Sequence, residues 1–483
     1  MTHPAMPIVE MVVDASNRIM METRDLTDKR QLCADVVLAF TLMVALILAA
    51  TSASAQESTA DVSSEEESVE ASNEPATEEV AVEEQPDTAE LQRRLEVLAA
   101  EVERMRSAEE AQPVDPEQAR RLGLAPSAAA AYGLDRGVSV AGYGEMLIEN
   151  YSDRDQGGNA TGKTTKSDFL RAVIYTGYRF NDKFLFNSEI EVEHGKEIYV
   201  EFAYLDYQAT ENFGVRGGML LAPMGLVNEF HEPTVFMGAE RPVTENKIIP
   251  STWRENGAGI YATSDWVSFR AYVMNGFNGS KFSSGGVRGG RQKGAKAQST
   301  SMAFTGRLDI TPTPGVFFGA SVYSGDSGQG AVVVDDTEYG IPTTIWDLHG
   351  QVQVRGFDLR GLFARAQIGD SAQLNAKLGK SGTSGIAEHM QGSYIQVGYD
   401  FLSQLTSAGG VSLTPYLRYE VVDTQAQMPD GFARSLSTDN TYVTAGIELK
   451  PIPNIAVKVD HAWVSNDADT GINQFNVNMG YAF

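Results

Sequence analysis

The last ten residues alternate in polarity without a break, and this constrains the fold more than any other feature of the chain. Phe475, Val477, Met479, Tyr481 and Phe483 fall on one side of an extended strand, and small or polar residues fall on the other. Soluble sheets use the same alternation. A strand that ends on the chain's terminal aromatic is, however, typical of barrels that meet lipid on one face and water on the other.

The composition agrees with such a barrel. Apolar residues make up 42% of the chain, and no apolar run outside the N-terminal region is long enough to span a bilayer as a helix. A spanning strand shows lipid only its alternate residues, so a barrel does not raise the overall hydrophobicity. The net charge of −26 comes mostly from the first 120 residues, which hold 26 acids and 9 bases. Because no basic domain exists, we expect no binding to nucleic acid.

Residues 1–55 have the pattern of a secretory signal peptide. The apolar run 36–50 follows Lys29 and Arg30 and precedes Ala-Ser-Ala at 53–55, which predicts cleavage after Ala55. An uncleaved anchor helix is the alternative, but about fifteen residues are few for a bilayer. Cys33 lies before the apolar run, so we expect the exported protein to form no disulfides.

Three further segments precede the barrel. Residues 56–90 carry thirteen acids and no base, which predicts a disordered acidic tether. In 91–110, apolar residues recur in steps of four and three, which predicts a short coiled coil. Three copies held close by a trimeric barrel would stabilise so short a coil, whereas the alternative is one amphipathic helix on another surface. Residues 111–137, rich in proline and alanine, are predicted to be a linker.

The rest of the chain, 138–483, repeats a period of two residues. The sixteen predicted strands are 138–151, 167–180, 183–193, 198–209, 212–221, 258–264, 266–276, 300–311, 315–323, 344–355, 357–369, 391–401, 411–423, 439–450, 454–464 and 474–483. Short turns and long connections alternate strictly between these strands. An even strand number with this rhythm predicts an all-β fold, a 16-stranded antiparallel transmembrane β-barrel around an aqueous lumen.

The longest connection, 222–257, is the third long loop, and it is the candidate pore constriction. It is polar but has enough apolar residues to fold inward, and opposed charges at a constriction filter solutes by size and sign. The alternative is an ordinary extracellular loop. The charged or titratable candidates are Glu229, His231, Glu232, Arg241, Glu245, Lys247, Arg254 and Glu255.

Strand parity also predicts which charged residues line the lumen. They are Arg171, Arg216, Arg270, Arg307, Arg360, Arg418, Glu189, Glu191, Glu420, Lys458 and Asp460. The arginines could form a track for anions. Because acids share the same face, we prefer cross-strand ion pairing. The loop 277–299 has five bases and no acid, and it could attract anions or bridge to acidic lipopolysaccharide.

Three short motifs match enzyme patterns without their structural context. Residues 157–164 satisfy the P-loop pattern, but an alternating strand follows where a helix is needed. His231 and Glu232 begin a zinc-protease motif, but Val235 occupies the place of the second histidine. Ser327 in Gly-Asp-Ser-Gly lies in a predicted external loop without evident partners. We therefore expect no enzyme activity, no cofactor and no metal.

Several segments resemble bacterial outer-membrane porins of the phosphate-selective porin O and P type. They are GMLLAPMGL at 218–226, NEFHEP at 228–233, ERP at 240–242, IPSTWRENG at 249–257 and VMNG at 273–276. The resemblance implies a sixteen-stranded trimeric barrel for passive uptake of small solutes, often anions. Phosphate-selective members have a throat rich in lysine and arginine, whereas loop 222–257 has five acids and three bases. Phosphate is therefore not expected as the solute.

Together these features predict a porin in the outer membrane of a Gram-negative bacterium, through which small hydrophilic or anionic solutes diffuse. Its expected contacts are outer-membrane lipid, lipopolysaccharide and two further copies in a homotrimer. The alternative from another class is a structural anchor, in which the coil and the acidic tether reach toward the cell wall while the barrel only holds them in the membrane.

Overall fold

The computed structural model describes residues 93–94, 96–97, 114–403 and 410–483. The predicted signal peptide, the acidic tether and most of the predicted coiled coil lie outside the described residues, so these assignments stay predictions. Among the described residues, no helix combines the length and the apolar character that a membrane crossing requires.

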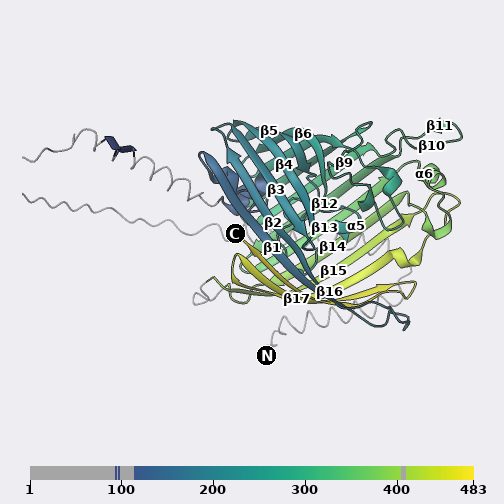
Figure 1. The fold of residues 1–483 in the computed structure, drawn as a ribbon. Coiled ribbons are helices and arrows are strands. Elements are labelled where there is room, and N and C mark those ends of the chain that lie inside the picture. The colour runs from purple at the N-terminus through teal and green to yellow at the C-terminus, as the bar shows by residue number, and fades with distance from the viewer. Residues whose placement is uncertain (1–92, 95, 98–113, 404–409) are drawn as a thin grey trace, which may run out of the picture. The chain divides into compact units, whose positions relative to one another are not determined.

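Sixteen antiparallel strands close into one barrel (Figure 1). The strands are β1 (Gly137–Tyr151), β2 (Lys166–Arg179), β3 (Phe184–Glu193), β4 (Glu197–Thr210), β5 (Phe213–Leu221), β6 (Arg254–Thr263), β7 (Val267–Asn275), β8 (Met302–Thr313), β9 (Val316–Asp326), β12 (Pro342–Val354), β13 (Phe357–Ile368), β14 (His389–Tyr399), β15 (Ser412–Gln427), β16 (Asp439–Ile452), β17 (Ile455–Asn466) and β18 (Gln474–Ala482). All sixteen predicted strands are confirmed within a few residues at their ends.

Each strand pairs with its neighbour in sequence, and the ring closes between the first strand and the last. In β1 and β18 the register runs from Tyr143 opposite Ala482 to Tyr151 opposite Gln474. Closure leaves none of the sixteen barrel strands with a free edge, which is the condition for a sheet to stand in lipid. Within β18 the predicted alternation holds, because Phe475 and Met479 are exposed while Asn476 and Asn478 are buried.

The connections alternate in length as predicted, with two exceptions. On the side of the short turns, the link between β14 and β15 spans 400–411 and is as long as a long loop. The link between β3 and β4 has only three residues, 194–196, although it lies on the side of the long loops. His194 and Gly195 there have φ of 53° and 68°, the left-handed backbone that a tight hairpin needs. The predicted strict alternation is therefore wrong at this hairpin.

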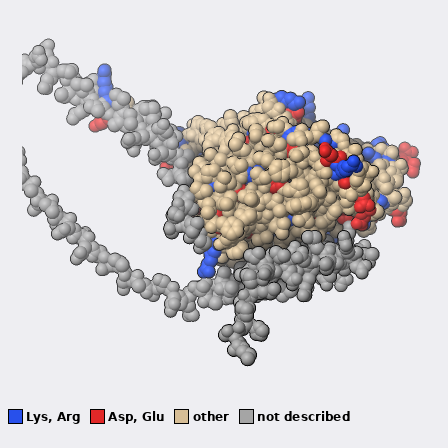
Figure 2. Space-filling view, turned by 90° about the horizontal axis from the view of Figure 1, so that it is seen from below, with Lys and Arg blue, Asp and Glu red and all other residues tan. Residues whose placement is uncertain are grey.

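The outer surface of the barrel is apolar. Exposed leucine, isoleucine, valine and phenylalanine occupy alternate positions on the strands, and the face in Figure 2 is mostly free of charged side chains. Aromatic residues are exposed near the short turns, where Phe357 packs on Tyr399 at 4.5 Å between ring centroids. A closed sixteen-stranded barrel with an apolar band and aromatic girdles is the architecture of outer-membrane proteins of Gram-negative bacteria. The protein is therefore placed in that membrane.

Short elements occupy the loops and the segment before β1. They are α4 (Pro116–Arg121), η2 (Ala130–Gly133), α5 (Thr244–Lys247), η3 (Gly279–Lys281), η4 (Arg288–Gly290), β10 (Val333–Val334), β11 (Thr337–Glu338), α6 (Ser371–Lys377), η5 (Gly382–Ser384) and η7 (Leu436–Thr438). The strands β10 and β11 form a two-stranded hairpin outside the barrel sheet.

Residues 114–136, here called the N-terminal lumen segment, are packed inside the barrel. Arg120 donates to Thr311 of β8 at 2.9 Å, Arg216 of β5 donates to the carbonyl of Leu122 at 2.7 Å, and Asn187 of β3 donates to the carbonyl of Ala128 at 2.8 Å. Its leucines and most of its alanines are buried. The sequence predicts a linker at 111–137, and the structure shows instead that its described part packs against the wall, because its small side chains fit a crowded lumen.

The lipid-facing band can be tested at Leu348, an exposed residue in the middle of β12. Replacing it by arginine, Leu348→Arg, is expected to reduce the free energy of unfolding from a bilayer by about 2–4 kcal/mol, because the charge meets hydrocarbon. The measurement is urea-dependent folding into phospholipid vesicles, followed by tryptophan fluorescence.

The matched control is Ile452→Arg, at the exposed end of β16 beside a short turn. There the cost is expected to be about 0–1 kcal/mol, because the side chain reaches the interface. Equal costs at the two positions would contradict a membrane band centred on Leu348.

Candidate functional site: a loop folded into the lumen

The third long loop runs from β5 to β6 and lies inside the barrel, so we call residues 222–253 the inner loop. Its predicted range ends at 257, but Arg254 and Glu255 belong to β6, where Arg254 pairs with Leu221 and Glu255 pairs with Leu220. These two predicted loop residues are therefore corrected to wall residues. The end of the predicted loop, 254–257, forms strand because residues 218–221 of β5 need a hydrogen-bonding partner along their whole length.

Basic side chains of the wall bind backbone carbonyls of the inner loop. Arg360 of β13 donates to Val235 at 2.7 Å, and Lys450 of β16 donates to Thr234 at 2.8 Å. Farther round, Lys458 of β17 donates to Gly238 at 3.1 Å. Carbonyls in a lumen need donors once water is displaced. The strands β13, β16 and β17 of the wall supply these donors.

Acidic side chains of the wall bind backbone N–H groups of the same loop. Glu420 of β15 accepts from Thr244 at 2.6 Å, and Asp460 of β17 accepts from Ala239 at 2.7 Å. Arg418 reaches the carbonyl of Glu240 at 3.3 Å and lies 3.7 Å from Glu420. Acidic side chains of the wall therefore bind N–H groups of the loop, and basic side chains of the wall bind its carbonyl groups.

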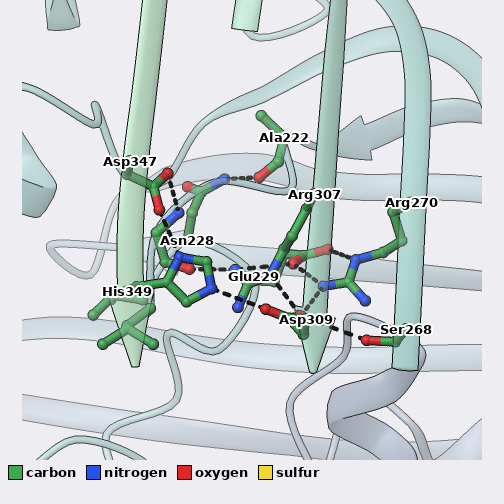
Figure 3. Close-up of polar contacts among 12 residues, drawn as sticks. Ala222, Asn228, Glu229, Ser268, Arg270, Arg307, Asp309, Asp347 and His349 are labelled. Carbon is green, nitrogen blue, oxygen red and sulfur yellow. Dashed lines mark hydrogen bonds and ion pairs between the residues drawn. The ribbon is translucent and has the colours of Figure 1, made fainter. Parts of the chain in front are cut away.

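Glu229 of the inner loop lies between two arginines of the wall (Figure 3). Arg270 of β7 approaches it at 3.0 Å and Arg307 of β8 at 3.6 Å. Both arginines also contact Asp309, at 3.2 and 2.8 Å. The four side chains are almost fully buried, so each charge depends on its partners. These two arginines are occupied by carboxylates and form no open anion track.

Two residues that the sequence analysis omitted complete this network. His349 of β12 bridges Asp309 at 2.9 Å and Asp347 at 2.6 Å, and Asp347 also accepts from the N–H of Gly225 at 3.2 Å. Both residues follow the same alternation as their strand, whose outer face carries Leu348. The parity rule that found Arg307 would therefore have found Asp347 and His349 too.

Glu245 joins the two halves of the inner loop to the wall. One carboxylate oxygen accepts from the N–H groups of Leu226 and Val227 at 2.7 and 2.6 Å, and the other accepts from the hydroxyl of Tyr394 at 2.5 Å. Burial raises the pKa of Glu245 to about 7, although these three donors oppose the rise. The group therefore titrates close to neutral pH.

Glu232 links the inner loop to the N-terminal lumen segment. Its carboxylate accepts from the backbone N–H groups of Ser127 and Ala128 at 3.0 and 3.2 Å. Burial raises the pKa of Glu232 to about 7, against the effect of these hydrogen bonds. The loop and the segment consequently form one continuous body within the lumen.

Three more ionic contacts lie on the β2–β4 side. His231 contacts Glu189 at 3.1 Å, Arg254 contacts Glu201 at 2.5 Å, and Arg171 contacts Glu191 at 3.0 Å. Strand parity did not predict the inward position of Glu201, because the register between β3 and β4 shifts at Glu189 and Ile190. As a result, both Glu201 and its neighbour Phe202 point inward. A β-bulge of this kind cannot be counted from one strand alone.

The remaining predicted lumen residue, Arg216, contacts Asp206 at 2.9 Å and stacks over Tyr261. Ten of the eleven predicted lumen residues are buried, and Arg360 is partly exposed. Among the predicted constriction residues, Glu229, His231, Glu232 and Glu245 are buried together, Arg241 donates to the carbonyl of His231 at 3.2 Å, and Lys247 is exposed.

The basic loop after β7 docks on the inner loop. Arg291 donates to the carbonyl of Pro250 at 3.0 Å, and Thr424 of β15 donates to the carbonyl of Ser284 at 2.7 Å. Burial, together with neighbouring arginines, lowers the pKa of Arg288 to about 9 and that of Arg291 to about 10. Both guanidinium groups therefore remain charged at neutral pH. They lie in the loop after β7, beside the predicted constriction residues of the inner loop.

A cavity of about 510 Å³ lies between the N-terminal lumen segment, the inner loop and the wall. Its lining includes short turns on the side where β1 begins, and its charged residues are Glu117, Arg120, Arg355, Asp358, Arg360, Asp400, Glu448 and Lys450. Four acids and four bases make its wall nearly neutral.

Comparison with known proteins gives one relative and several barrels of solved structure. No family model matches the chain. An uncharacterized protein of Aquifex aeolicus (strain VF5) is 37% identical over 356 residues, which are 70% of this chain and 78% of that protein.

Outer-membrane expressed OmpT of Vibrio cholerae has 12% identity and a TM-score of 0.45, over 72% of this chain and 97% of its own. The anion-selective porin of Comamonas acidovorans has 13% identity and a TM-score of 0.44, over 72% and 99%. Salmonella typhi OmpF in complex with daunomycin has 15% identity and a TM-score of 0.48, over 72% and 98%.

The titration of Glu245 gives a pH-dependent stability. A group whose pKa rises from 4.5 to about 7 on folding stabilises the protein below pH 4.5 and loses that effect as the pH rises through 7. The free energy of unfolding of the wild type is expected to fall by an amount on the order of 3 kcal/mol between pH 4 and pH 8 because of Glu245, and this fall should be absent in Glu245→Gln.

The measurement is the difference in unfolding free energy between the wild type and Glu245→Gln at the two pH values, taken from urea titrations in vesicles. Subtraction cancels the other titrating groups. A pH dependence that is the same in both proteins would show that Glu245 titrates as an exposed carboxyl group does.

Proposed function

We propose that this chain, which belongs to the same protein family as the Aquifex aeolicus relative, is an outer-membrane porin for passive diffusion of small hydrophilic solutes. The observation that carries the proposal is a closed barrel with an apolar exterior and a lumen lined by charged residues. A barrel of sixteen strands is wide enough for an aqueous path. A wall that served only as an anchor would not need this polar lining.

The inner loop is proposed as the constriction. It is bound to the wall through Glu229, His231, Glu245 and backbone groups on several strands, so it is held across the lumen rather than projecting outside. Rigid infolded loops narrow a pore and set the size limit of its solutes. Arg254 and Glu255 contribute from the adjoining strand.

Selection by size is proposed over selection by charge. The cavity wall carries equal numbers of acids and bases, and Arg270 and Arg307 are neutralised by Glu229 and Asp309. Phosphate selectivity needs unpaired cations in the throat. Anions are proposed to pass among other small solutes, with the basic loop after β7 raising their concentration at the entrance.

Homotrimer formation and contact with lipopolysaccharide belong to the same proposal. The trimer is supported by the apolar spacing in 91–110 and by the resemblance at 218–276, and the lipopolysaccharide contact by the bases of the loop after β7.

A structural anchor is the second candidate, and the packed lumen favours it. Most charged residues of the wall that contact the inner loop or the N-terminal lumen segment are buried, and a cavity of about 510 Å³ lies on the side of the short turns. If these parts never move, the barrel is closed. Single-channel recording in planar bilayers decides between the two: stepwise conductance supports the porin, and a silent barrel supports the anchor.

The N-terminal lumen segment is expected to limit conductance. Deleting 114–136 removes the contacts of Glu117, Arg120 and Ser127 with the wall and the inner loop. Single-channel conductance should rise about twofold or more, since the aqueous cross-section grows. The folded state of the variant is checked by its heat-dependent mobility on gels, and an unchanged conductance would show that solutes bypass the segment.

Ion preference is expected to follow the charge of the cavity. Lys450 lines it next to Glu448 at 3.2 Å, so Lys450→Glu leaves an excess of negative charge there. The cation-to-anion permeability ratio should rise about twofold or more in a salt gradient. The reversal potential measures this ratio, and Lys163→Glu in the exposed first loop is the control for a charge change outside the lumen. Equal shifts in both variants would contradict a path through the cavity.

A further inference from the structure

A buried cluster on the β3–β4 side brings together three metal-binding side chains from separate elements. Glu189 comes from β3, Glu201 from β4 and His231 from the inner loop, and one possible ligand atom of each lies within 4.8 Å of the other two. All three residues are at most 2% exposed. Water cannot solvate their charges, so the neighbouring residues or a bound ion must do so.

The charges around the cluster do not balance. Four buried carboxylates meet two arginines in direct contact: Arg171 contacts Glu145 at 3.2 Å and Glu191 at 3.0 Å, and Arg254 contacts Glu201. Among the residues that the structure describes, Glu189 has His231 as its titratable partner, and it accepts from the hydroxyl of Tyr143 at 3.4 Å. Glu191 and Glu201 share a hydrogen bond, so one of these two carboxyl groups carries a proton. One negative charge is then in excess of the two arginines, and a bound cation or a second proton on His231 would neutralise it.

The hydrogen bonds of His231 prepare its imidazole for a cation. Nδ1 lies 2.9 Å from the carbonyl oxygen of Asn228, which can only accept, so Nδ1 carries a proton. In the neutral ring Nε2 then presents a lone pair, and it faces Oε1 of Glu189 at 3.1 Å. Two lone pairs at this distance repel unless a cation or a second proton lies between them. A histidine that donates its other N–H to a carbonyl is the usual arrangement at metal sites.

Two carboxylate oxygens in the cluster also lack a nitrogen or hydroxyl donor. The Oε2 atoms of Glu189 and Glu201 are buried, and no amide, guanidinium or hydroxyl group in the described ranges donates to them, although the carboxyl groups of Glu201 and Glu191 share a hydrogen bond. A buried oxygen of a charged group that lacks a donor is costly, because it has lost its hydrogen bonds to water. The Oε1 atom of Glu201 is fixed by the hydroxyl of Thr252 at 3.0 Å and by Arg254, which leaves Oε2 as the oxygen available to a ligand.

We propose that Glu189, Glu201 and His231 bind one divalent transition-metal ion of the Zn²⁺ class. Imidazole and carboxylate together suit Zn²⁺, whose bonds to nitrogen and oxygen are about 2.0–2.2 Å long. A separation of at most 4.8 Å between donor atoms closes onto such an ion with small rotations of the side chains. Ca²⁺ fits less well, because it takes six to eight oxygen ligands.

The bound ion would tie the inner loop to the wall. Two ligands lie on adjacent strands and the third lies on the loop, so the metal would be a crosslink between the loop and the wall. Val235 occupies the place of the second histidine in the sequence motif, whereas two ligands of the proposed site come from β3 and β4, which are distant from His231 in sequence. The inference is independent of solute flow, because metal binding can be measured without transport.

The test is calorimetric titration of the full chain with ZnCl₂ at pH 7.5, in detergent and after treatment with a chelator. The wild type is expected to bind one Zn²⁺ per chain. The double variant Glu189→Gln/Glu201→Gln and the single variant His231→Gln should each lose at least about 100-fold in affinity, and Thr252→Val about 10-fold, because it orients a ligand without touching the metal. Visible absorption of the Co²⁺-substituted protein should change in the same variants.

The matched control is Glu448→Gln, which removes a buried lumen carboxylate on β16 and should leave the Zn²⁺ affinity unchanged. Heat-dependent mobility on gels identifies variants that fail to fold, and His231→Gln tests the site if the double variant does not form a barrel. No Zn²⁺ binding by the wild type overturns the proposal and leaves a protonated His231 paired with Glu189. Equal binding by the wild type and by folded ligand variants also overturns it.

Discussion

The structure depends on the closure of one ladder of backbone hydrogen bonds. The pairing of β1 with β18 turns sixteen strands into a ring, so that every strand has two neighbours. In lipid an unpaired strand edge would leave peptide groups without partners, and each would cost several kcal/mol. The apolar exterior and the polar lumen follow from this closure, because alternate side chains of a closed ring must point to opposite sides.

Within the ring, a second rule governs the lumen: buried charges are satisfied by one another and by peptide groups of the inner loop. Arg307 shows both, since it pairs with Asp309 and also donates to the carbonyl of Gly225. Buried pairs of this kind add little net stability, but losing one partner is costly. They therefore fix where the loop lies more than they strengthen the barrel. The cluster at Glu189 departs from this balance, and for that reason it points to an additional cation.

The sequence predicted the barrel well because each spanning strand carries its own two-residue signal. The strand β18 could be assigned from Phe475 to Phe483 alone, and the inward position of Arg307 and Lys458 followed from parity. The alternation did not predict the inward position of Glu201, because a bulge shifts the register there. It also did not predict strand at 254–255, because β6 begins before its alternation of polar and apolar residues starts. The partners of Glu229 and Glu232 could not be predicted, since contacts between a loop and distant strands leave no local pattern. The four alanines at 128–131 indicate tight packing, which the prediction of a linker did not take into account.

The N-terminal lumen segment also has a bearing on the order of assembly. Arg120 and Thr311 are 191 residues apart in sequence, and Glu117 and Gly315 are 198 apart. Such contacts have a large loop-closure cost, so they form only after β8 and β9 have taken their places. The first part of the barrel domain to leave the ribosome is thus among the last to settle. A wide, hydrated ring would come first, and the filling of its interior would be a late maturation step.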